Sequence, residues 1–455
     1  MGRYFGTDGF RGEANVKLTA DHAFKIGKYL GWYFGEKRRK EGEDGSPRVV
    51  IGKDTRRSSY MFEYALCAGL TSTGADAYIM HVTTTPSVSY IVRTEGYDCG
   101  IMISASHNAY YDNGIKLIAA NGEKMDEETI AGVEDYLDGK TPEPPAVTRS
   151  QIGKTVDFAA GRNRYIGYLI SLATRSYRGM RIGLDCANGS AWMIAKSVFD
   201  ALGARTFVIG CDPDGLNINR GYGSTHIENL QRLVRDEKLD AGFAFDGDAD
   251  RCLCVDENGN ILTGDHILYI CGCYMKDHHE LPGNLIVSTV MSNFGFFRSL
   301  DEAGISYEKT AVGDKYVSEA MVQNGSRLGG EQSGHIIFKK FASTGDGILT
   351  AIMVMEVMLE TKHTLGELSK PMYFYPQTLK SVHVTDQQAA LDDPVVKAAI
   401  HDAEARIGDN GRVLVRKSGT EPVIRVMAEA EDQVVCDTAV REIIAVIEAK
   451  GYAVK

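Results

Sequence analysis

The sequence lacks a long apolar run near its amino terminus, where MGRYFGTDGFRG mixes charged residues with glycine. A signal peptide carries an apolar stretch of roughly 7–15 residues, and a membrane-spanning helix needs about 20. This segment has neither. We therefore expect a cytoplasmic protein with no signal peptide and no membrane anchor.

The sequence is also poor in cysteine, with nine in 455 residues. An odd number of cysteines without a secretory signal indicates reduced thiols and argues against a disulfide framework. One alternative is a soft metal site made of two C-x-C pairs and three nearby histidines: Cys252, Cys254, Cys271, Cys273, His266, His278 and His279. The C-x-C spacing places both side chains on one face of a strand, so buried core residues explain it more simply.

Positive charge is in the minority, because 50 Lys and Arg residues against 61 Asp and Glu residues give a formal net charge of −11. A general nucleic-acid surface needs clustered Lys and Arg, so this class is disfavoured. The one cationic run, residues 37–40, is followed at once by Glu41 and Glu43, and we predict a solvated loop there. An anionic substrate would need positive charge concentrated locally.

Three segments share one pattern, in which an apolar strand, a polar or glycine-bearing loop and a helical stretch lead through Leu and Gly to a second strand. They span residues 48–80, 181–210 and 284–309. Repeated strand–helix–strand units predict parallel or mixed sheets covered by helices. The sequence therefore predicts three similar α/β domains.

The pattern changes after about Lys370, where short strands and two helical stretches predict a smaller α+β domain. Since domains usually have about 100–200 residues, a length of 455 residues suggests three or four of them. The expected limits are 1–150, 151–255 and 256–368 for the α/β domains and 369–455 for the α+β domain. Ligands of such units commonly lie at the carboxyl ends of the strands, so each domain can contribute one loop to a shared cleft.

The first such loop, ISASHNAYYDNGIKL, follows an apolar strand and exposes Ser106 beside His107 and Asn108. Serine needs a base or a metal to become a good nucleophile, so Ser106 is a candidate only if partners lie nearby. Lys116 lies beyond an Asn-Gly turn that returns the chain toward the serine. Its ammonium group could assist proton transfer or screen phosphate charge. Considered alone, S-A-S-H is an ordinary polar turn.

The second loop, FAFDGDADRCLCVDENG, has Asp246, Asp248 and Asp250 alternating after an apolar strand. Three carboxylates this close repel one another without a counter-ion. Oxygen-only ligands suit Mg²⁺, Mn²⁺ or Ca²⁺ better than zinc or copper. An EF-hand is an alternative, because Glu257 falls at its twelfth position. Arg251 argues against it, since position six needs glycine and the flanks are typical of strands.

Three further segments have polar side chains suited to a sugar phosphate. In GGEQSGHIIFKKF, Glu331, Ser333 and His335 alternate across a turn, a spacing that suits sugar hydroxyls. In RKSGTEP and just beyond it, a guanidinium group, hydroxyls and backbone N–H groups suit a phosphate dianion: Arg416, Ser418, Gly419, Thr420 and Arg425. The opening FGTDGFRG adds Arg11 in a Gly-rich turn. Each segment alone could be a plain turn.

These loops, in this order, resemble the signatures of the α-D-phosphohexomutase superfamily over the whole chain. FGTDGFRG, ISASHN with NGIKL, DGDADR, GGEQSGH and RKSGTEP are similar to the family's amino-terminal, active-site serine, metal, sugar and phosphate segments. The resemblance implies three α/β/α domains and a smaller α+β domain, arranged like a heart around a central cleft. Two residues depart from the family pattern: Ala109 stands where proline is common, and Phe10 where isoleucine is frequent. We expect Ala109 to alter only the mobility of the loop.

The resemblance also implies roles. Ser106 would carry the phosphoryl group, and one Mg²⁺ per subunit would be held by the serine phosphate with Asp246, Asp248 and Asp250. The reaction centre would be lined by Arg11, His107, Lys116, Arg251 and His335. The sugar and its second phosphate would be bound by Glu331, Ser333, Asp314, Lys315, Arg416, Ser418, Gly419, Thr420 and Arg425, of which Arg425 is the weaker candidate. Which residue is the acid and which the base stays open.

The implied activity is a phosphosugar mutase that converts glucosamine 6-phosphate to glucosamine 1-phosphate through a phosphoserine and a hexosamine 1,6-bisphosphate. Gln332 favours glucosamine, since related glucose and mannose enzymes often have methionine there. The alternatives are a phosphoglucomutase or phosphomannomutase and, in another class, an inactive sugar-phosphate-binding protein. A hexose or hexosamine phosphate is the expected partner, with no nucleic acid or membrane, and a homodimer is left open.

Overall fold

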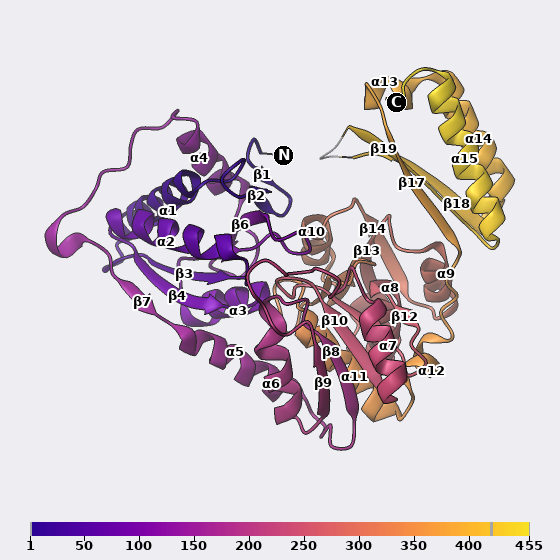
Figure 1. The fold of residues 1–455 in the computed structure, drawn as a ribbon, viewed down its shortest axis with the longest axis horizontal. Coiled ribbons are helices and arrows are strands. Elements are labelled where there is room, and N and C mark those ends of the chain that lie inside the picture. Colours follow the sequence, from indigo (N-terminus) through magenta and orange to yellow (C-terminus); the bar gives the residue numbers. More distant parts are fainter. Residues whose placement is uncertain (1, 419–421, 455) are drawn as a thin grey trace. The chain divides into compact units, whose positions relative to one another are not determined.

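The computed structural model describes residues 2–418 and 422–454 in two compact units (Figure 1). The first runs to Met291 and continues over Gly304–Lys370; the second combines Ser292–Ala303 with the chain from Pro371 onward. Within the described residues, no helix is long and apolar enough to cross a membrane.

The first unit opens with a seven-stranded mixed sheet in the order β1-β2-β6-β5-β3-β4-β7. Its strands are β1 Phe5–Gly6, β2 Gly9–Glu13, β3 Arg48–Lys53, β4 Asp76–Val82, β5 Cys99–Ile103, β6 Asp112–Ala119 and β7 Thr155–Asp157. Its helices are α1 Ala20–Glu41, α2 Arg57–Ser72, α3 Thr85–Glu95 and α4 Glu127–Leu137, followed by α5 Ala159–Leu172. Val49 and Ile51 pack in the same core as α1 and α2, whereas Val50 packs with α3 on the other face. This two-sided burial explains why β3 is a continuous apolar run.

Two more sheets complete the first unit. The five-stranded sheet has the order β12-β11-β10-β8-β9 and the four-stranded sheet the order β14-β13-β15-β16. Their strands are β8 Arg181–Asp185, β9 Arg205–Ile209, β10 Ala241–Phe245, β11 Cys252–Val255, β12 Ile261–Leu262, β13 Leu285–Thr289, β14 Ser306–Thr310, β15 Leu328–Gly330 and β16 Ile336–Phe338. Their helices are α6 Ile194–Ala201, α7 Glu228–Glu237, α8 Gly264–Asp277, α10 Asp314–Asn324, α11 Gly347–Thr361 and α12 Leu365–Ser369. Short 3₁₀ turns are η1 Arg149–Gln151, η2 Ser190–Trp192 and η3 Pro282–Asn284.

The second unit has a three-stranded antiparallel sheet in the order β17-β19-β18. Its strands are β17 Gln377–His383, β18 Gly411–Lys417 and β19 Val423–Ala430, and its helices are α9 Phe294–Glu302, α13 Gln387–Asp392, α14 Pro394–Ile407 and α15 Gln433–Ala449, with the 3₁₀ turn η4 Gly408–Asn410. The helices α14 and α15 lie together along this sheet (Figure 1). Asn293, before α9, donates from Nδ2 to the Tyr375 carbonyl at 3.0 Å. The Phe294 N–H donates to the buried Glu429 carboxylate at 2.9 Å, which ties α9 to this unit.

The predicted fold class is confirmed. In each repeat the two strands pair in parallel, β3 with β4, β8 with β9 and β13 with β14. The domain limits stay predictions, and three elements lie across them. Strand β7 joins the first sheet, β12 joins the second, and α9 belongs to the second unit.

Two local predictions were wrong. The cationic run at residues 37–40 is not a loop: it forms the last turn of α1, which ends at Gly42 with φ +74°. Basic side chains are favourable there because they face the negative end of the helix dipole. Cys271 and Cys273 lie on α8, not on a strand, whereas Cys252 and Cys254 lie on β11 as expected.

Candidate active site

The loop after β5 places Ser106 in a buried position with a left-handed backbone, φ +51°. Its Oγ donates to Asp246 Oδ2 at 2.5 Å, although the two residues are 140 positions apart. Gly247 makes this approach possible, because a Cβ there would lie 2.4 Å from the Ser106 carbonyl oxygen. The first and second sheets therefore meet at this serine.

The loop between β10 and β11 gathers three buried carboxylates, and ligand atoms of Asp246, Asp248 and Asp250 all lie within 4.8 Å of one another. Burial, then repulsion by Asp250 and Asp248, raises the pKa of Asp246 well above its ordinary value. The Oδ1 atoms of Asp248 and Asp250 are buried without a hydrogen-bond partner among the described residues. Buried oxygen atoms of this kind suit a hard divalent cation, which would also relieve the repulsion.

Lys116, on β6, supplies positive charge beside this loop. Its Nζ lies 2.7 Å from Asp248 Oδ2, 3.2 Å from Asp250 Oδ2 and 3.4 Å from Asp8 Oδ1. Burial opposes the ammonium form, but the three carboxylates outweigh it and raise the pKa of Lys116 well above its usual value. Burial likewise opposes ionisation of Asp250, yet Lys116 and His335 hold its pKa well below the usual range.

His107 lies beside the serine hydroxyl, and the charges of two arginines act on its imidazole. Arg11, on β2, pairs with Asp8, and the Arg251 N–H donates to Asp246 Oδ1 at 3.2 Å. His107 Nδ1 lies 3.3 Å from Ser106 Oγ and 3.4 Å from Arg251 Nη1. Burial, then the positive charges of Arg251 and Arg11, lowers the pKa of His107 to about 4. The imidazole is therefore neutral near pH 7.

The turn between β15 and β16 brings the third sheet to the same place. His335 Nδ1 lies 3.8 Å from Asp250 Oδ2, and its Nε2 lies 3.6 Å from Asp314 Oδ2 at the start of α10. Burial opposes the imidazolium, but Asp250 and Asp314 outweigh it and raise the pKa of His335 to about 9. Glu331 accepts from the Gly313 N–H at 3.1 Å, and the Ser333 hydroxyl lies 3.4 Å from the Glu331 carboxylate.

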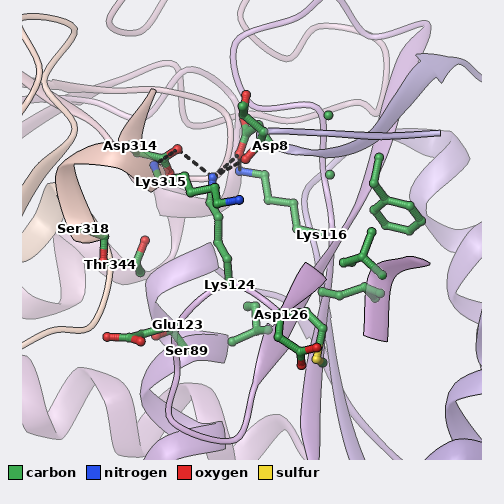
Figure 2. Close-up of a pocket in the computed structure, with 18 of the residues that line it drawn as sticks. Asp8, Ser89, Lys116, Glu123, Lys124, Asp126, Asp314, Lys315, Ser318 and Thr344 are labelled. Atoms are coloured by element: carbon green, nitrogen blue, oxygen red, sulfur yellow. Dashed lines mark hydrogen bonds and ion pairs between the residues drawn. The ribbon is translucent and has the colours of Figure 1, made fainter. Parts of the chain in front are cut away.

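A pocket of about 680 Å³ lies beside Lys116, Asp250 and His335, between the first and third sheets. Figure 2 shows Lys124 reaching toward Asp8 and Asp314 across it. The Nζ of Lys124 lies 2.6 Å from Asp314 Oδ1. The walls carry both signs of charge, and polar groups placed in this way would fix the orientation of a charged ligand.

The residues predicted to bind the second phosphate belong to the second unit. Arg416, on β18, faces Arg425, on β19, in the antiparallel register. Burial, then the charge of Arg425, lowers the pKa of Arg416. Ser418 is buried and its N–H donates to the Val423 carbonyl at 2.9 Å. Gly419 and Thr420 lie outside the described residues, and the role of the whole set stays a prediction.

Four domain descriptions of one family match successive parts of the chain. They are Phosphoglucomutase/phosphomannomutase alpha/beta/alpha domain I at residues 2–143, domain II at 163–259, domain III at 263–374 and the C-terminal domain at 379–446. The chain belongs to the phosphoglucomutase/phosphomannomutase family.

Members of this family match the chain over its full length. Phosphoglucosamine mutase of Lachnospira eligens is 65% identical over 454 residues, with 100% of both chains covered. The protein of the same name from Lachnoclostridium phytofermentans is 58% identical, with 99% of each covered. Among solved structures, a phosphoglucomutase/phosphomannomutase family protein from Burkholderia thailandensis is 24% identical with a TM-score of 0.80, covering 100% of this chain and 99% of that one. It shows the shared fold. The two full-length relatives, at 65% and 58% identity, show that the chain is an enzyme of the mutase class.

A second solved structure of the same fold is Aspergillus fumigatus N-acetylphosphoglucosamine mutase in complex with GlcNAc-6P and magnesium. It is 19% identical with a TM-score of 0.69, covering 98% of this chain and 96% of that one. At this identity the likeness concerns the fold alone.

The structure does not support either alternative metal site, the EF-hand or the Cys/His site. The EF-hand is wrong, because the Asp loop joins two antiparallel strands and Glu257 accepts from the Gly366 N–H at the start of α12. For the soft metal site, the aspartate group is the only set of three or more such ligands found within the described chain.

Sequence reasoning missed four polar residues that contact the centre: Asp8, Arg56, Thr85 and Asn219. Asp8 lies inside the quoted FGTDGFRG segment, and its charge beside Arg11 was a usable signal. The other three lie in segments typical of turns and helix starts, where Arg, Thr and Asn need no functional explanation.

Proposed function

We propose that the chain interconverts glucosamine 6-phosphate and glucosamine 1-phosphate by way of a phosphorylated Ser106. The observation that carries the proposal is the hydrogen bond from the Ser106 hydroxyl to Asp246, which belongs to a group of three buried carboxylates. The full-length relatives named phosphoglucosamine mutase, at 65% and 58% identity, support the glucosamine substrate.

The proposed cofactor is one Mg²⁺, held by Asp246, Asp248 and Asp250 together with the serine phosphate. When bound, it would neutralise charge on the transferring phosphoryl group. The choice of magnesium is supported by the all-carboxylate donor set and by the magnesium in the Aspergillus fumigatus complex.

The proposed reaction runs in two transfers. In the first, the bond between phosphorus and Ser106 Oγ breaks while a sugar hydroxyl oxygen bonds to the phosphorus, which gives hexosamine 1,6-bisphosphate. The hydroxyl proton moves to a nearby base, for which the neutral imidazole of His107 is the candidate. Lys116 and His335, whose pKa values are raised, are the candidates for the acid that protonates the departing Ser106 oxygen. After the bisphosphate turns over, Ser106 takes up the other phosphoryl group. Arg11 and Arg251 would stabilise the negative charge during both steps.

The proposed sugar contacts come from Glu331 and Ser333, with Asp314 and Lys315 beside them. The non-reacting phosphate would be bound by Arg416, Ser418, Gly419, Thr420 and, more weakly, Arg425. Phosphoglucomutase or phosphomannomutase activity is the second candidate, since the same chemistry serves other hexoses. Side-by-side turnover of glucosamine, glucose and mannose phosphates distinguishes them.

The decisive experiment is Ser106→Ala. We expect mutase turnover to fall about 10³-fold or more, because the nucleophile is removed. Mass spectrometry of the unmodified protein should find a phosphoryl group on the Ser106 peptide and none in the variant. Ser171→Ala, which removes an exposed hydroxyl on α5, is the matched control and should keep full activity. Near-normal turnover by Ser106→Ala, with its melting temperature unchanged, would end the proposal, because another residue would then have to carry the phosphoryl group.

A further inference from the structure

The carboxylate of Asp248 is held by a residue from outside its own domain repeat. Thr85, the first residue of α3, donates from Oγ1 to Asp248 Oδ2, and its N–H donates to the Asp248 carbonyl at 3.0 Å. The two residues are 163 positions apart, and both side chains are buried. Helix α3 packs on the first sheet, whereas Asp248 follows β10 of the second.

Because of this contact, the two carboxylate oxygens of Asp248 differ in their hydrogen bonding. Oδ2 accepts hydrogen bonds from Thr85 and from Lys116 at 2.7 Å. Oδ1 is buried and has no hydrogen-bond partner within the described chain. Because a carboxylate is planar, fixing Oδ2 and the adjoining backbone carbonyl also fixes the direction of Oδ1.

Lys116 alone fixes this orientation poorly. Its Nζ is shared with Asp250 and Asp8, at 3.2 and 3.4 Å, and an ammonium group on a flexible stem imposes little direction. A buried threonine hydroxyl is short, and its χ1 angle is restricted by β-branching. Thr85 is therefore the more precise of the two donors.

The Thr85 hydroxyl is not needed to start the helix. Thr84 has that task, because its side chain accepts from the Ser87 N–H as the N-cap of α3. Two adjacent buried threonines thus have separate partners, one within α3 and one on the aspartate loop.

We propose that Thr85 is a positioning residue for divalent-cation binding: it orients the Asp248 carboxylate so that Oδ1 serves as the ligand atom. The inference rests on the proposed metal site. Residues that hold a ligand through a hydrogen bond typically change metal affinity about 10- to 100-fold when they are removed.

The test is Mn²⁺ binding to the full-length protein, measured by calorimetry and by the electron paramagnetic resonance signal of unbound Mn²⁺. All samples are brought to one phosphorylation state, checked by mass spectrometry. Thr85→Val keeps the shape and the backbone N–H but loses the hydroxyl, and we expect its Mn²⁺ dissociation constant to rise about 10- to 100-fold. Thr85→Ser restores the donor and should bind Mn²⁺ nearly as well as the unmodified chain.

The matched control is Thr84→Val. It removes the N-cap hydroxyl, so we expect a lower melting temperature with unchanged Mn²⁺ affinity. Equal Mn²⁺ affinity of Thr85→Val and the unmodified protein would overturn the inference while leaving the metal site in place. Equal weakening by both valine variants would also overturn it, because the effect would then come from loosening α3. Absence of Mn²⁺ binding by the unmodified protein would overturn the proposed metal site itself, and the inference with it.

Discussion

Two donors hold the backbone of the serine loop: Arg56, in the turn after β3, and Asn219, in the loop between β9 and α7. Arg56 Nη2 lies 3.2 Å from the Ser106 carbonyl oxygen and 2.6 Å from that of Asn108. Asn219 Nδ2 donates to the same two oxygens at 2.8 and 2.9 Å. Since a left-handed backbone at a serine costs roughly 1–3 kcal/mol, surrounding contacts must maintain it. Arg56 and Asn219 provide those contacts, and Ala109 contributes no proline ring to stiffen the loop.

Asn219→Asp should therefore slow catalysis while the fold persists. Asn219 has φ +61°, which aspartate also tolerates, so the backbone need not move. The variant replaces an amide donor with a carboxylate facing two carbonyl oxygens. We expect kcat to fall about 10- to 100-fold, as for other small displacements of a reacting group, with little change in KM.

The control for this variant is Gln231→Glu, which removes a comparable amide-to-carbonyl hydrogen bond, to Gly259, outside the loop that carries Asn219. It should leave kcat unchanged. If Asn219→Asp turned over at the normal rate, the loop would not depend on this contact.

For single residues, the sequence predicts the side chains that carry the chemistry better than the residues that hold them in place. The three aspartates stand out by their residue type and spacing, and Ser106 stands out because its loop takes its place in the order of signature segments. Arg56 and Asn219 act on main-chain oxygens, which every residue has, so no spacing of side chains indicates them. Their role follows only from the conformation of the loop.

Glu134, on helix α4, anchors the main chain of the amino-terminal segment. The Glu134 carboxylate accepts from the N–H groups of Arg3, Tyr4 and Phe5 at 2.9, 2.8 and 2.8 Å. Burial disfavours the ionised form, but these three donors outweigh it and lower the pKa of Glu134 below its usual value. The segment leads directly into β1 and β2, which carry Asp8 toward the centre.

The lowered pKa makes this anchor dependent on pH. Because the carboxylate is more acidic in the folded chain, its contribution to stability is complete above the unfolded-state pKa, near 4.3. That contribution is lost as the pH falls through the folded-state pKa. We predict that Glu134→Gln weakens protection of the residue 3–5 amides at pH 7 by about 1–2 kcal/mol, since bonds to a charged acceptor are stronger.

Hydrogen exchange at residues 3–5, corrected for intrinsic rates, measures this effect. The difference between Glu134→Gln and the unmodified chain should shrink as the pH is lowered below about 4. Glu128→Gln, an exposed position on the same helix, is the control and should change nothing. A difference that stayed constant down to pH 3 would contradict the assigned role of the charge.

Helices and strands are predicted well where a regular apolar pattern shows which faces are buried. They are predicted poorly where contacts between distant residues determine the unit to which an element belongs. The three repeats follow from apolar strands such as β3, whose residues are buried on both faces. In the sequence, α9 is the helix of the third strand–helix–strand repeat, yet it packs in the second unit. The contacts of Asn293 and Phe294 with Tyr375 and Glu429 determine this, and they join residues 82 and 135 positions apart.

In the whole molecule, the centre joins the three sheets of the first unit. Ser106 contacts Asp246, the Thr55 hydroxyl donates to the Asn188 carbonyl at 2.6 Å, and His335 lies beside Asp250. The order of the signature loops along the chain predicts that they converge, because each follows a strand. The order of the loops does not predict where the chain passes from one unit to the other, since that depends on side-chain contacts between residues far apart in the sequence.

A cation bound by the aspartate group should therefore stabilise the first unit selectively. Any ligand that binds only the folded state stabilises it by RT ln(1 + [L]/Kd), about 2.7 kcal/mol at 100 times Kd. All three aspartates lie in the first unit. We expect saturating Mn²⁺ to slow amide exchange in β10, β11 and the Ser106 loop, and to leave β17, β18 and β19 unchanged.

Hydrogen exchange of the full chain, with and without Mn²⁺, tests this prediction peptide by peptide. Asp248→Asn is the control, because it removes a carboxylate charge while keeping the size of the side chain, and it should abolish most of the Mn²⁺ effect. Equal slowing in β10 and in β19 would contradict selective stabilisation, since a gain confined to one unit cannot protect amides that open independently of it. Slowing confined to the first unit, and lost in Asp248→Asn, would locate the cation among the three carboxylates by a measurement that does not depend on turnover.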